Sequence, residues 1–309
     1  MKTIIYAGTY TSKTSKGIYR LSFEDGKLEN LGLFCEIENP KYLVKDTDGI
    51  FSVADFKHDS GVALVSAEGG IKDQIAFEER TSCFIAKKDN DIYTANYHTG
   101  TVSHILYENG KMKYKNAVQI QDGAGCHQVL IKDEIVLVPC LFLDRVFIFD
   151  RGLKKLGSIH FNANTGPRHG VFTKDGEYLY LVSELSNELF VIHVGDWKIE
   201  YQIPVLMSGE THIRDTAAIR LSKNEKYLYV STRTKDVISV IELDNHKPEV
   251  IQTTSCGGKH PRDFILMENY LLCANRNSNE VVCFNVNDDG TLGKVKDRVE
   301  VPEVVSLVY

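Results

Sequence analysis

The sequence lacks several features that mark common classes of protein. No apolar run is long enough to cross a bilayer, and the segment from Met1 to Tyr10 is too weakly apolar for a secretory signal. We therefore expect a cytoplasmic protein with no membrane partner. The seven cysteines are odd in number and include no Cys-x-x-Cys pair. This favours free thiols over a disulfide framework or a zinc site.

Excess positive charge is also missing. The formal net charge is -6, which gives the chain no general attraction to nucleic acid or to anionic membranes. Any anion must therefore be bound by local groups of arginine and lysine. A Gly-x-Ser-x-Gly motif is absent too, so nothing points to a covalent serine mechanism. The 43% hydrophobic and 25% charged residues are typical of a globular protein rather than a disordered one.

Helical periodicity is almost absent, and short runs rich in Val, Ile, Tyr and Phe recur instead. They are separated by turn sequences such as Glu24-Asp25-Gly26 and Glu108-Asn109-Gly110. Seven of the runs resemble one another, and their equivalent positions recur every 41 to 48 residues. The equivalent positions are Thr9, Asp55, Asn96, Cys140, Glu184, Thr232 and Asn275. A repeat of this length that contains only strands is typical of propeller blades.

A second series of seven strands precedes these runs, offset along the chain. It begins near residue 39 and ends at 301–307, so the first run (4–10) has no strand before it and the last strand has no run after it. The C-terminal strand therefore completes a blade with the N-terminal strands. We predict an all-β, seven-bladed propeller of four-stranded antiparallel blades, forming one domain over 1–309. A β-solenoid is the alternative, but it would not explain the split unit.

Ionisable side chains gather at one edge of the predicted blades. Because an antiparallel meander reverses at each turn, the start of each first strand lies beside the end of the second. These positions from all blades would surround one mouth of the central channel. The starts contribute Lys41, His127, Arg168, His169, Asp215, Arg262, Asp263 and Glu303. The ends contribute Tyr10, Asp55, His58, Asn96, Tyr97, His98, Glu184, Arg233 and Arg276.

This combination predicts a pocket for a small, oxygen-rich anion. Arginine binds carboxylate and phosphate groups in a planar fork, and His or Glu can act as a general acid or base. Metal binding is not expected, since arginines interspersed among the carboxylates repel a cation, and no cofactor is expected.

Several motifs resemble the seven-bladed propeller lactonase family. They are Gly8-Thr9-Tyr10-Thr11, Gly17-Ile18-Tyr19, Gly125-Cys126-His127, Gly166-Pro167-Arg168-His169 with Glu184-Leu185, Arg233-Thr234 and Pro261-Arg262-Asp263. The family includes propeller-type 6-phosphogluconolactonases and carboxymuconate-lactonising enzymes. The resemblance covers essentially the whole chain but is weak evidence for the substrate. The chain departs from the family at Asp215-Thr216-Ala217-Ala218, which lacks a tryptophan common in relatives.

The resemblance implies a catalytic set of His127, Glu184, Arg168 and Arg233. The ring adds substrate-binding candidates, which are His169, Arg262, Arg276, Asn96 and Asp215. Structural roles remain as alternatives. Glu184 could clamp two blades through Arg168 or Arg233, and Arg262 could pair with its neighbour Asp263. Trp197 and most tyrosines are expected to pack between blades.

Three functions follow from this site. The first is hydrolysis of a sugar-acid lactone, most concretely 6-phosphogluconolactone, by water that His127 or Glu184 activates while arginines stabilise the oxyanion. The second is the lactonising, cycloisomerase reaction with the same groups. The third is a propeller that binds a metabolite or a protein without turnover, which the fold alone does not exclude. The expected partner is a small anionic lactone, and the chain is expected to be a monomer or a weak homo-oligomer.

Overall fold

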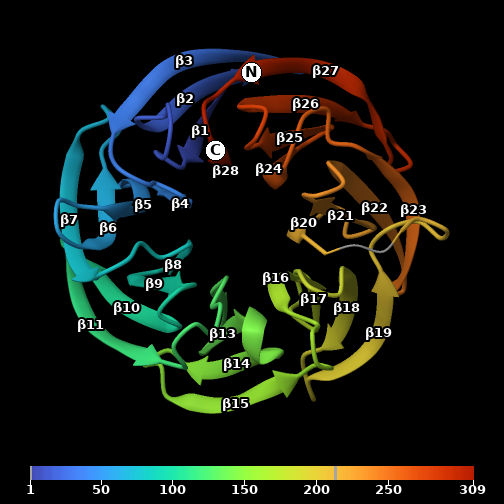
Figure 1. Cartoon of the computed structure of the whole chain (residues 1–309), viewed down its shortest axis with the longest axis horizontal. Coiled ribbons are helices and arrows are strands. Elements are labelled where there is room, and N and C mark those ends of the chain that lie inside the picture. Colours follow the sequence, from blue (N-terminus) through green and yellow to red (C-terminus); the bar gives the residue numbers. More distant parts are fainter. Residues whose placement is uncertain (1, 212–213) are drawn as a thin grey trace.

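The computed structural model describes residues 2–211 and 214–309 and shows seven four-stranded antiparallel sheets around a central axis (Figure 1). The sequence prediction of an all-β, seven-bladed propeller is confirmed. Among the described residues the only helix is a single 3₁₀ turn, η1 (Leu141–Leu143). Each blade is a meander. In six blades the strands run outward from the axis in chain order, and in the seventh the C-terminal strand is innermost.

The innermost strands are three to seven residues long and differ in how deeply they are buried. They are β28 (Val304–Val308), β4 (Leu43–Asp46), β8 (Phe84–Lys88), β12 (Leu130–Lys132), β16 (Pro167–Phe172), β20 (Thr216–Leu221) and β24 (Pro261–Met267). The second strands follow as β1 (Thr3–Thr9), β5 (Gly49–Asp55), β9 (Asp91–Asn96), β13 (Ile135–Cys140), β17 (Tyr178–Ser183), β21 (Tyr227–Thr232) and β25 (Tyr270–Asn275). These two sets of strands form the wall of the channel.

The third strands of the blades are largely buried, and the outermost strands are the most exposed. The third strands are β2 (Gly17–Glu24), β6 (Ser60–Val65), β10 (Thr101–Glu108), β14 (Arg145–Asp150), β18 (Glu188–His193), β22 (Val237–Asp244) and β26 (Glu280–Val286). The outermost are β3 (Lys27–Glu36), β7 (Ile71–Glu78), β11 (Lys111–Gln119), β15 (Lys155–His160), β19 (Lys198–Pro204), β23 (Lys247–Ser255) and β27 (Leu292–Glu300).

The two ends of the chain close the ring in one blade, as the split repeat predicted. Strand β28 pairs antiparallel with β1, with Tyr6 opposite Val308 and Gly8 opposite Ser306. The amide of Tyr10 also donates to the carbonyl of Glu303 over 3.1 Å. This pairing leaves no open sheet edge between the first and last blades.

Two-residue turns confirm the turn sequences identified above. Asn109 and Gly110 join β10 to β11 with φ angles of 52° and 76°, and Asp25 and Gly26 join β2 to β3 with 48° and 79°. A type I′ hairpin needs a positive φ at both central residues, which Asn-Gly and Asp-Gly adopt most easily.

The blades pack through apolar side chains, and three tyrosines fasten neighbouring blades. The Tyr93 hydroxyl donates to the carbonyl of Arg151 over 2.6 Å, and the Tyr229 hydroxyl donates to that of Gly290 over 2.8 Å. The Tyr180 hydroxyl lies 2.7 Å from Nδ1 of His246. Each tyrosine is near the start of a second strand, so the same contact recurs between different blades. The expected packing role of these tyrosines is confirmed.

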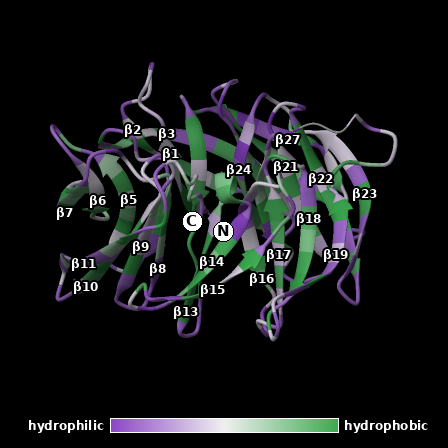
Figure 2. Cartoon of the chain, turned by 60° about the horizontal axis from the view of Figure 1, so that its bottom comes forward, coloured by the Kyte–Doolittle hydropathy of each residue, from purple (hydrophilic) through white to green (hydrophobic). Residues whose placement is uncertain are grey.

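Hydropathy follows this architecture. Figure 2 shows apolar residues along the strands and hydrophilic residues in the loops at both edges. No helix in the described parts of the chain has the length and apolar character needed to cross a membrane.

Candidate functional site

The antiparallel meander brings the predicted groups to one mouth of the channel. Arg168 is the second residue of β16, and Glu184 directly follows β17, whose last residue Ser183 pairs with Pro167. Arg233 follows the second strand of the next blade in the same way. His127 precedes β12. Residues that lie as many as 106 positions apart in the chain therefore meet at this mouth.

A cavity of about 260 Å³ opens between these groups. It is lined by Tyr10, Lys41, Thr81, Cys83, Tyr97, His98, His127, Glu184, Arg233 and Arg262. Its volume suits a small metabolite better than a drug-sized ligand.

The carboxylate of Glu184 is held by two arginines from neighbouring blades. Nε of Arg168 donates to Oε2 over 2.7 Å, and Nη2 of Arg233 lies 2.9 Å from Oε1. Arg168 is only 1% exposed and also donates from Nη1 to the carbonyl of Ala217. Burial alone would raise the pKa of Glu184, but the charges of Arg168 and Arg233 outweigh it and hold that pKa below its usual value. Glu184 is therefore ionised at neutral pH.

Arg168 stays charged despite its burial. Burial lowers the pKa of its guanidinium to about 10, against the opposing effect of Glu184, and this value is still well above neutrality. The blade-to-blade clamp considered for Glu184 is thus present in the structure. Such a clamp also orders the arginines at the cavity, so it is compatible with a catalytic role.

His127 and His169 form a buried pair beneath the cavity. Nδ1 of His127 lies 3.2 Å from Nε2 of His169, and the residues are 5% and 3% exposed. Burial, followed by the charge of Arg168, holds the pKa of both imidazoles well below 6.5. His127 is therefore neutral at pH 7. The contact with His169 occupies its Nδ1 and leaves Nε2 as its other ring nitrogen. His169 itself does not line the cavity.

Asp215 supports Arg233 from behind. Its Oδ1 lies 3.1 Å from Nη2 of Arg233, its backbone amide donates to the carbonyl of Glu184 over 2.8 Å, and its carbonyl accepts from the Arg233 amide over 3.0 Å. Asp215 has a φ of 92° and accepts a further bond from the Thr234 hydroxyl. Its position makes it a positioning residue for Arg233, since the residues that line the cavity do not include it.

The prediction of an ion pair between Arg262 and its neighbour Asp263 is wrong. Oδ1 of Asp263 instead lies 2.5 Å from Nη2 of Arg220 on the neighbouring inner strand, β20. Arg262 is the extra residue of a β-bulge between Pro261 and Asp263, and a bulge re-aims a side chain. Arg262 lines the cavity, whereas Asp263 does not. Arg262 packs over the ring of Tyr10, and so does Arg276.

Other residues of the predicted ring have structural roles. The amide of Asn96 is fully buried and donates to Glu78 and to the carbonyl of Arg80, so the structure does not bring it to the cavity. Asp55 is bound by Asn39, Ser60 and Thr81.

Glu303, another residue of the predicted ring, also has a structural role. Its carboxylate accepts from the Ser12 hydroxyl and from the amides of residues 13–15, and so fixes the loop after β1.

Thr81 and Cys83 line the cavity, but nothing in the sequence singled them out. His260 is a further residue that the sequence did not identify: its Nε2 is buried without a hydrogen-bond partner in the described chain. It lies close enough to Arg233, Arg262 and Arg276 for their charges to act on it. Its only sequence signal was its place directly before Pro261.

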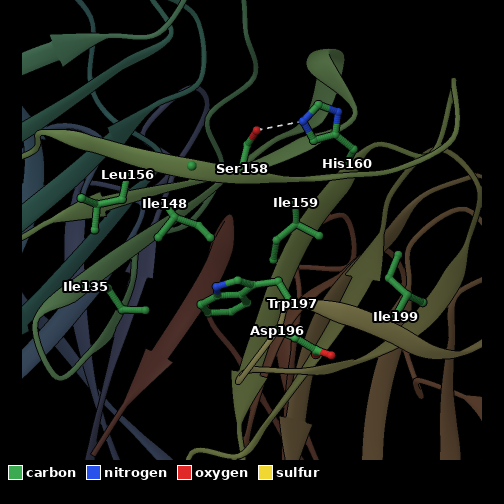
Figure 3. Close-up of a pocket in the computed structure, with 10 residues that line it drawn as sticks. Ile135, Ile148, Leu156, Ser158, Ile159, His160, Asp196, Trp197 and Ile199 are labelled. Carbon is green, nitrogen blue, oxygen red and sulfur yellow. Dashed lines mark hydrogen bonds between the residues drawn. The ribbon is translucent and has the colours of Figure 1, made fainter.

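A second hollow, on the outer side of the ring, has a different chemistry. It is a groove of about 580 Å³ between two blades, and Trp197 lies at its centre among isoleucines (Figure 3). In this groove the Ser158 hydroxyl forms a hydrogen bond with the imidazole of His160. Asp196 is the one charged residue that lines the groove. Trp197 packs against the apolar cluster between these blades, as expected. The groove therefore lacks the cations that an anionic substrate would need.

Lowering the pH from 7 to 5 is expected to destabilise the protein. The folded-state pKa values of His127, His169 and His260 are depressed, so below about pH 6.5 the unfolded chain binds protons that the folded chain does not. The free energy of unfolding therefore keeps its full value above that pH and falls as the pH drops below it. The slope of the free energy of unfolding against pH should approach about 1.4 kcal/mol per pH unit for each histidine.

Urea unfolding at pH 7, 6 and 5 measures this slope. His169→Asn should make it shallower by the share of one histidine. A free energy of unfolding that stays constant between pH 7 and 5 would show that these imidazoles are not buried and neutral.

The comparisons with known proteins agree with this architecture. The family model "Lactonase, 7-bladed beta-propeller" matches residues 4–309. An uncharacterised protein of Staphylococcus epidermidis is 31% identical, with 96% of each chain covered. Two solved structures, at 24% and 20% identity, share the fold. One is a Bacteroides fragilis protein provisionally named as a 6-phosphogluconolactonase, with a TM-score of 0.84 and 99% of this chain and 97% of that chain covered.

The other is the periplasmic gluconolactonase of Pseudomonas aeruginosa, with a TM-score of 0.88 and coverage of 100% and 99%. A family match over nearly the whole chain, together with a relative above 30% identity, decides the assignment. The chain belongs to the seven-bladed β-propeller lactonase family.

Proposed function

We propose that the protein hydrolyses a sugar-acid lactone, most concretely 6-phosphogluconolactone, at the mouth of the channel. The observation that carries the proposal is the Glu184 carboxylate held between Arg168 and Arg233 beside the neutral, buried His127. Membership of the lactonase family and the provisional name of the Bacteroides protein support the same reaction.

The groups at the cavity can perform each step of lactone opening. Neutral His127 takes a proton from water through Nε2, and the water oxygen bonds to the lactone carbonyl carbon. Arg233, which lines the cavity, stabilises the oxyanion that develops. When the intermediate collapses, the bond between the carbonyl carbon and the ring oxygen breaks. His127 then returns its proton to the departing oxygen, which leaves a hydroxy acid.

Glu184 and Arg168 act through Arg233 in this scheme. Both oxygens of Glu184 already accept from guanidinium groups, and its pKa is lowered, so its carboxylate is a poor base. Its role is to orient Arg233 toward the substrate. Arg168 is almost fully buried and therefore serves as a positioning residue.

A phosphorylated substrate fits a cytoplasmic enzyme, because a phosphate ester does not cross membranes freely. A neutral lactone would be the natural substrate of a periplasmic enzyme such as the Pseudomonas protein. Rates measured with the two substrates therefore distinguish an enzyme for a phosphorylated lactone from an enzyme for a neutral one.

The test is hydrolysis of fresh 6-phosphogluconolactone and fresh gluconolactone, followed by acid release at constant pH. We expect the protein to accelerate opening of the phosphorylated lactone above its spontaneous rate. A chelator should leave this rate unchanged, because the arginines at the site disfavour a divalent cation. Absence of any acceleration, combined with a melting temperature that 6-phosphogluconate raises, would support a binding propeller instead.

A further inference from the structure

Three cations converge on the ring of Tyr10 at one side of the mouth. The guanidinium carbon of Arg276 lies 4.2 Å from the ring centre, that of Arg262 lies 5.5 Å away, and Nζ of Lys41 lies 5.8 Å away. The cations come from two blades: Lys41 precedes β4, whereas Arg262 is the second residue of β24 and Arg276 follows β25 in the same sheet. Tyr10 follows β1 in a third blade. The aromatic face attracts these cations but does not neutralise them.

The same cations lack carboxylate partners. In residues 2–211 and 214–309, no carboxylate oxygen lies within 4 Å of the charged groups of Lys41, Arg262 or Arg276. This distinguishes them from Arg168, which pairs with Glu184, and from Arg233, which pairs with Glu184 and Asp215. Among the described groups, the only hydrogen bond from these three cationic side chains is from Nζ of Lys41 to the carbonyl of Thr81 over 3.2 Å.

The nearby carboxylates are already occupied. The charge of Lys41 acts on Asp55 and Glu78, but Asp55 is bound by hydroxyl and amide groups and Glu78 accepts from Ser82 and Asn96. Neither residue is therefore free to turn toward the cations without breaking its own bonds. The three cations therefore have no carboxylate in direct contact among the described residues.

These positive charges lower the pKa values of two nearby histidines. Burial and the charges of Arg233, Arg262 and Arg276 lower the pKa of His260 to about 4, and its Nε2 is left without a partner. Burial and the charge of Lys41 also lower the pKa of His98, which lines the cavity. A buried polar atom without a partner among unpaired cations is the environment that an anion would satisfy.

We propose that Lys41, Arg262 and Arg276 form an anion subsite around Tyr10 that binds the phosphate group of a phosphorylated sugar lactone. A phosphate monoester carries a charge of about -1.5 to -2 at pH 7 and offers three acceptor oxygens, which matches three cations better than a single carboxylate does. The orientation of the substrate rests on the proposed function: its lactone carbonyl lies at His127 and Arg233. The anion subsite itself does not depend on turnover.

Substrate comparison tests the subsite. Lys41→Met and Arg262→Gln should each raise KM for 6-phosphogluconolactone about 10- to 100-fold, the effect of one lost charged hydrogen bond. Each should change kcat/KM for gluconolactone less than about twofold. Lys45→Met and Arg145→Gln are matched controls at exposed positions that do not line the cavity, and neither should change KM or kcat for either lactone. Equal losses with both lactones would overturn the subsite and leave the lactonase function standing.

Phosphate binding gives a second readout without turnover. Inorganic phosphate added to the wild-type protein should raise the pKa values of His260 and His98, measured from their imidazole NMR signals, and acetate should do so much less. Arg262→Gln should remove the effect of phosphate. Phosphate-induced shifts in a protein that opens no lactone would support the subsite and contradict the proposed function. Histidine signals that do not respond to phosphate would overturn the subsite.

Discussion

Replacing His127 by alanine is expected to slow lactone hydrolysis about 100- to 10,000-fold, the usual contribution of a general base. His127 is buried at the cavity, is neutral at pH 7, and uses Nδ1 for its contact with His169, so its other nitrogen is available to accept a proton from water. The loss should fall mainly on kcat, because the cations that hold the substrate remain in place. The measurement is the initial rate with saturating fresh 6-phosphogluconolactone.

Matched variants separate this effect from damage to the fold. His160→Ala removes an exposed histidine from the outer groove beside Trp197 and should leave the rate unchanged. His127→Ala should lower the melting temperature, because it leaves a cavity and removes the partner of Nε2 of His169, so its rate should be measured at a temperature at which the variant is folded. A folded His127→Ala protein with the wild-type rate would show that another group activates water.

Glu184→Gln distinguishes the two candidate bases. If His127 is the base, this variant should lower the rate through misorientation of Arg233 but keep the acid limb of the pH profile at the same position. If the fall in rate at low pH disappears in Glu184→Gln and persists in His127→Ala, the base is Glu184.

Replacing Glu303 by alanine is expected to lower the free energy of unfolding by about 2 to 4 kcal/mol, because hydrogen bonds to a charged group contribute about 1.5 to 3 kcal/mol each and do not add fully. The Glu303 carboxylate accepts from the amides of Lys13, Thr14 and Ser15 over 2.8 to 3.3 Å, and also from the Ser12 hydroxyl. It therefore connects the C-terminal strand to the loop after β1, at the point where the ring closes. Urea unfolding measures the loss.

Glu300→Ala is the matched control for this variant. Glu300 lies at the exposed end of β27, three residues before Glu303, and its loss should change stability by less than about 0.5 kcal/mol. Equal stability of Glu303→Ala and Glu300→Ala would show that the carboxylate is not needed for closure. The closed blade also carries Tyr10, so Glu303→Ala should weaken phosphate binding as well.

The sequence predicted the architecture because the repeat is long and regular. The strand period, the turn pairs Asp25-Gly26 and Asn109-Gly110, and the split unit at the termini all pointed to one closed ring. The meander rule then placed Arg168, Glu184 and Arg233 at one edge, and the structure joins them in one ion-paired group.

Side-chain partners were harder to predict, since they depend on which neighbouring blade faces each residue. Arg262 and Asp263 are adjacent in sequence, but a β-bulge at Arg262 re-aims its side chain, and Asp263 pairs with Arg220 of the next blade instead. Asn96 occupies the predicted edge, yet its amide binds inward to Glu78. Small residues such as Thr81 and Cys83 give no signal in a sequence, although they line the cavity.

The most direct test is a crystal structure of the protein with the reaction product, 6-phosphogluconate. We predict that the product lies at the mouth of the channel, with its carboxylate beside His127 and Arg233 and its phosphate among Lys41, Arg262 and Arg276. A product bound elsewhere, such as in the groove beside Trp197, or a mouth that stays empty at saturating product, would contradict the account.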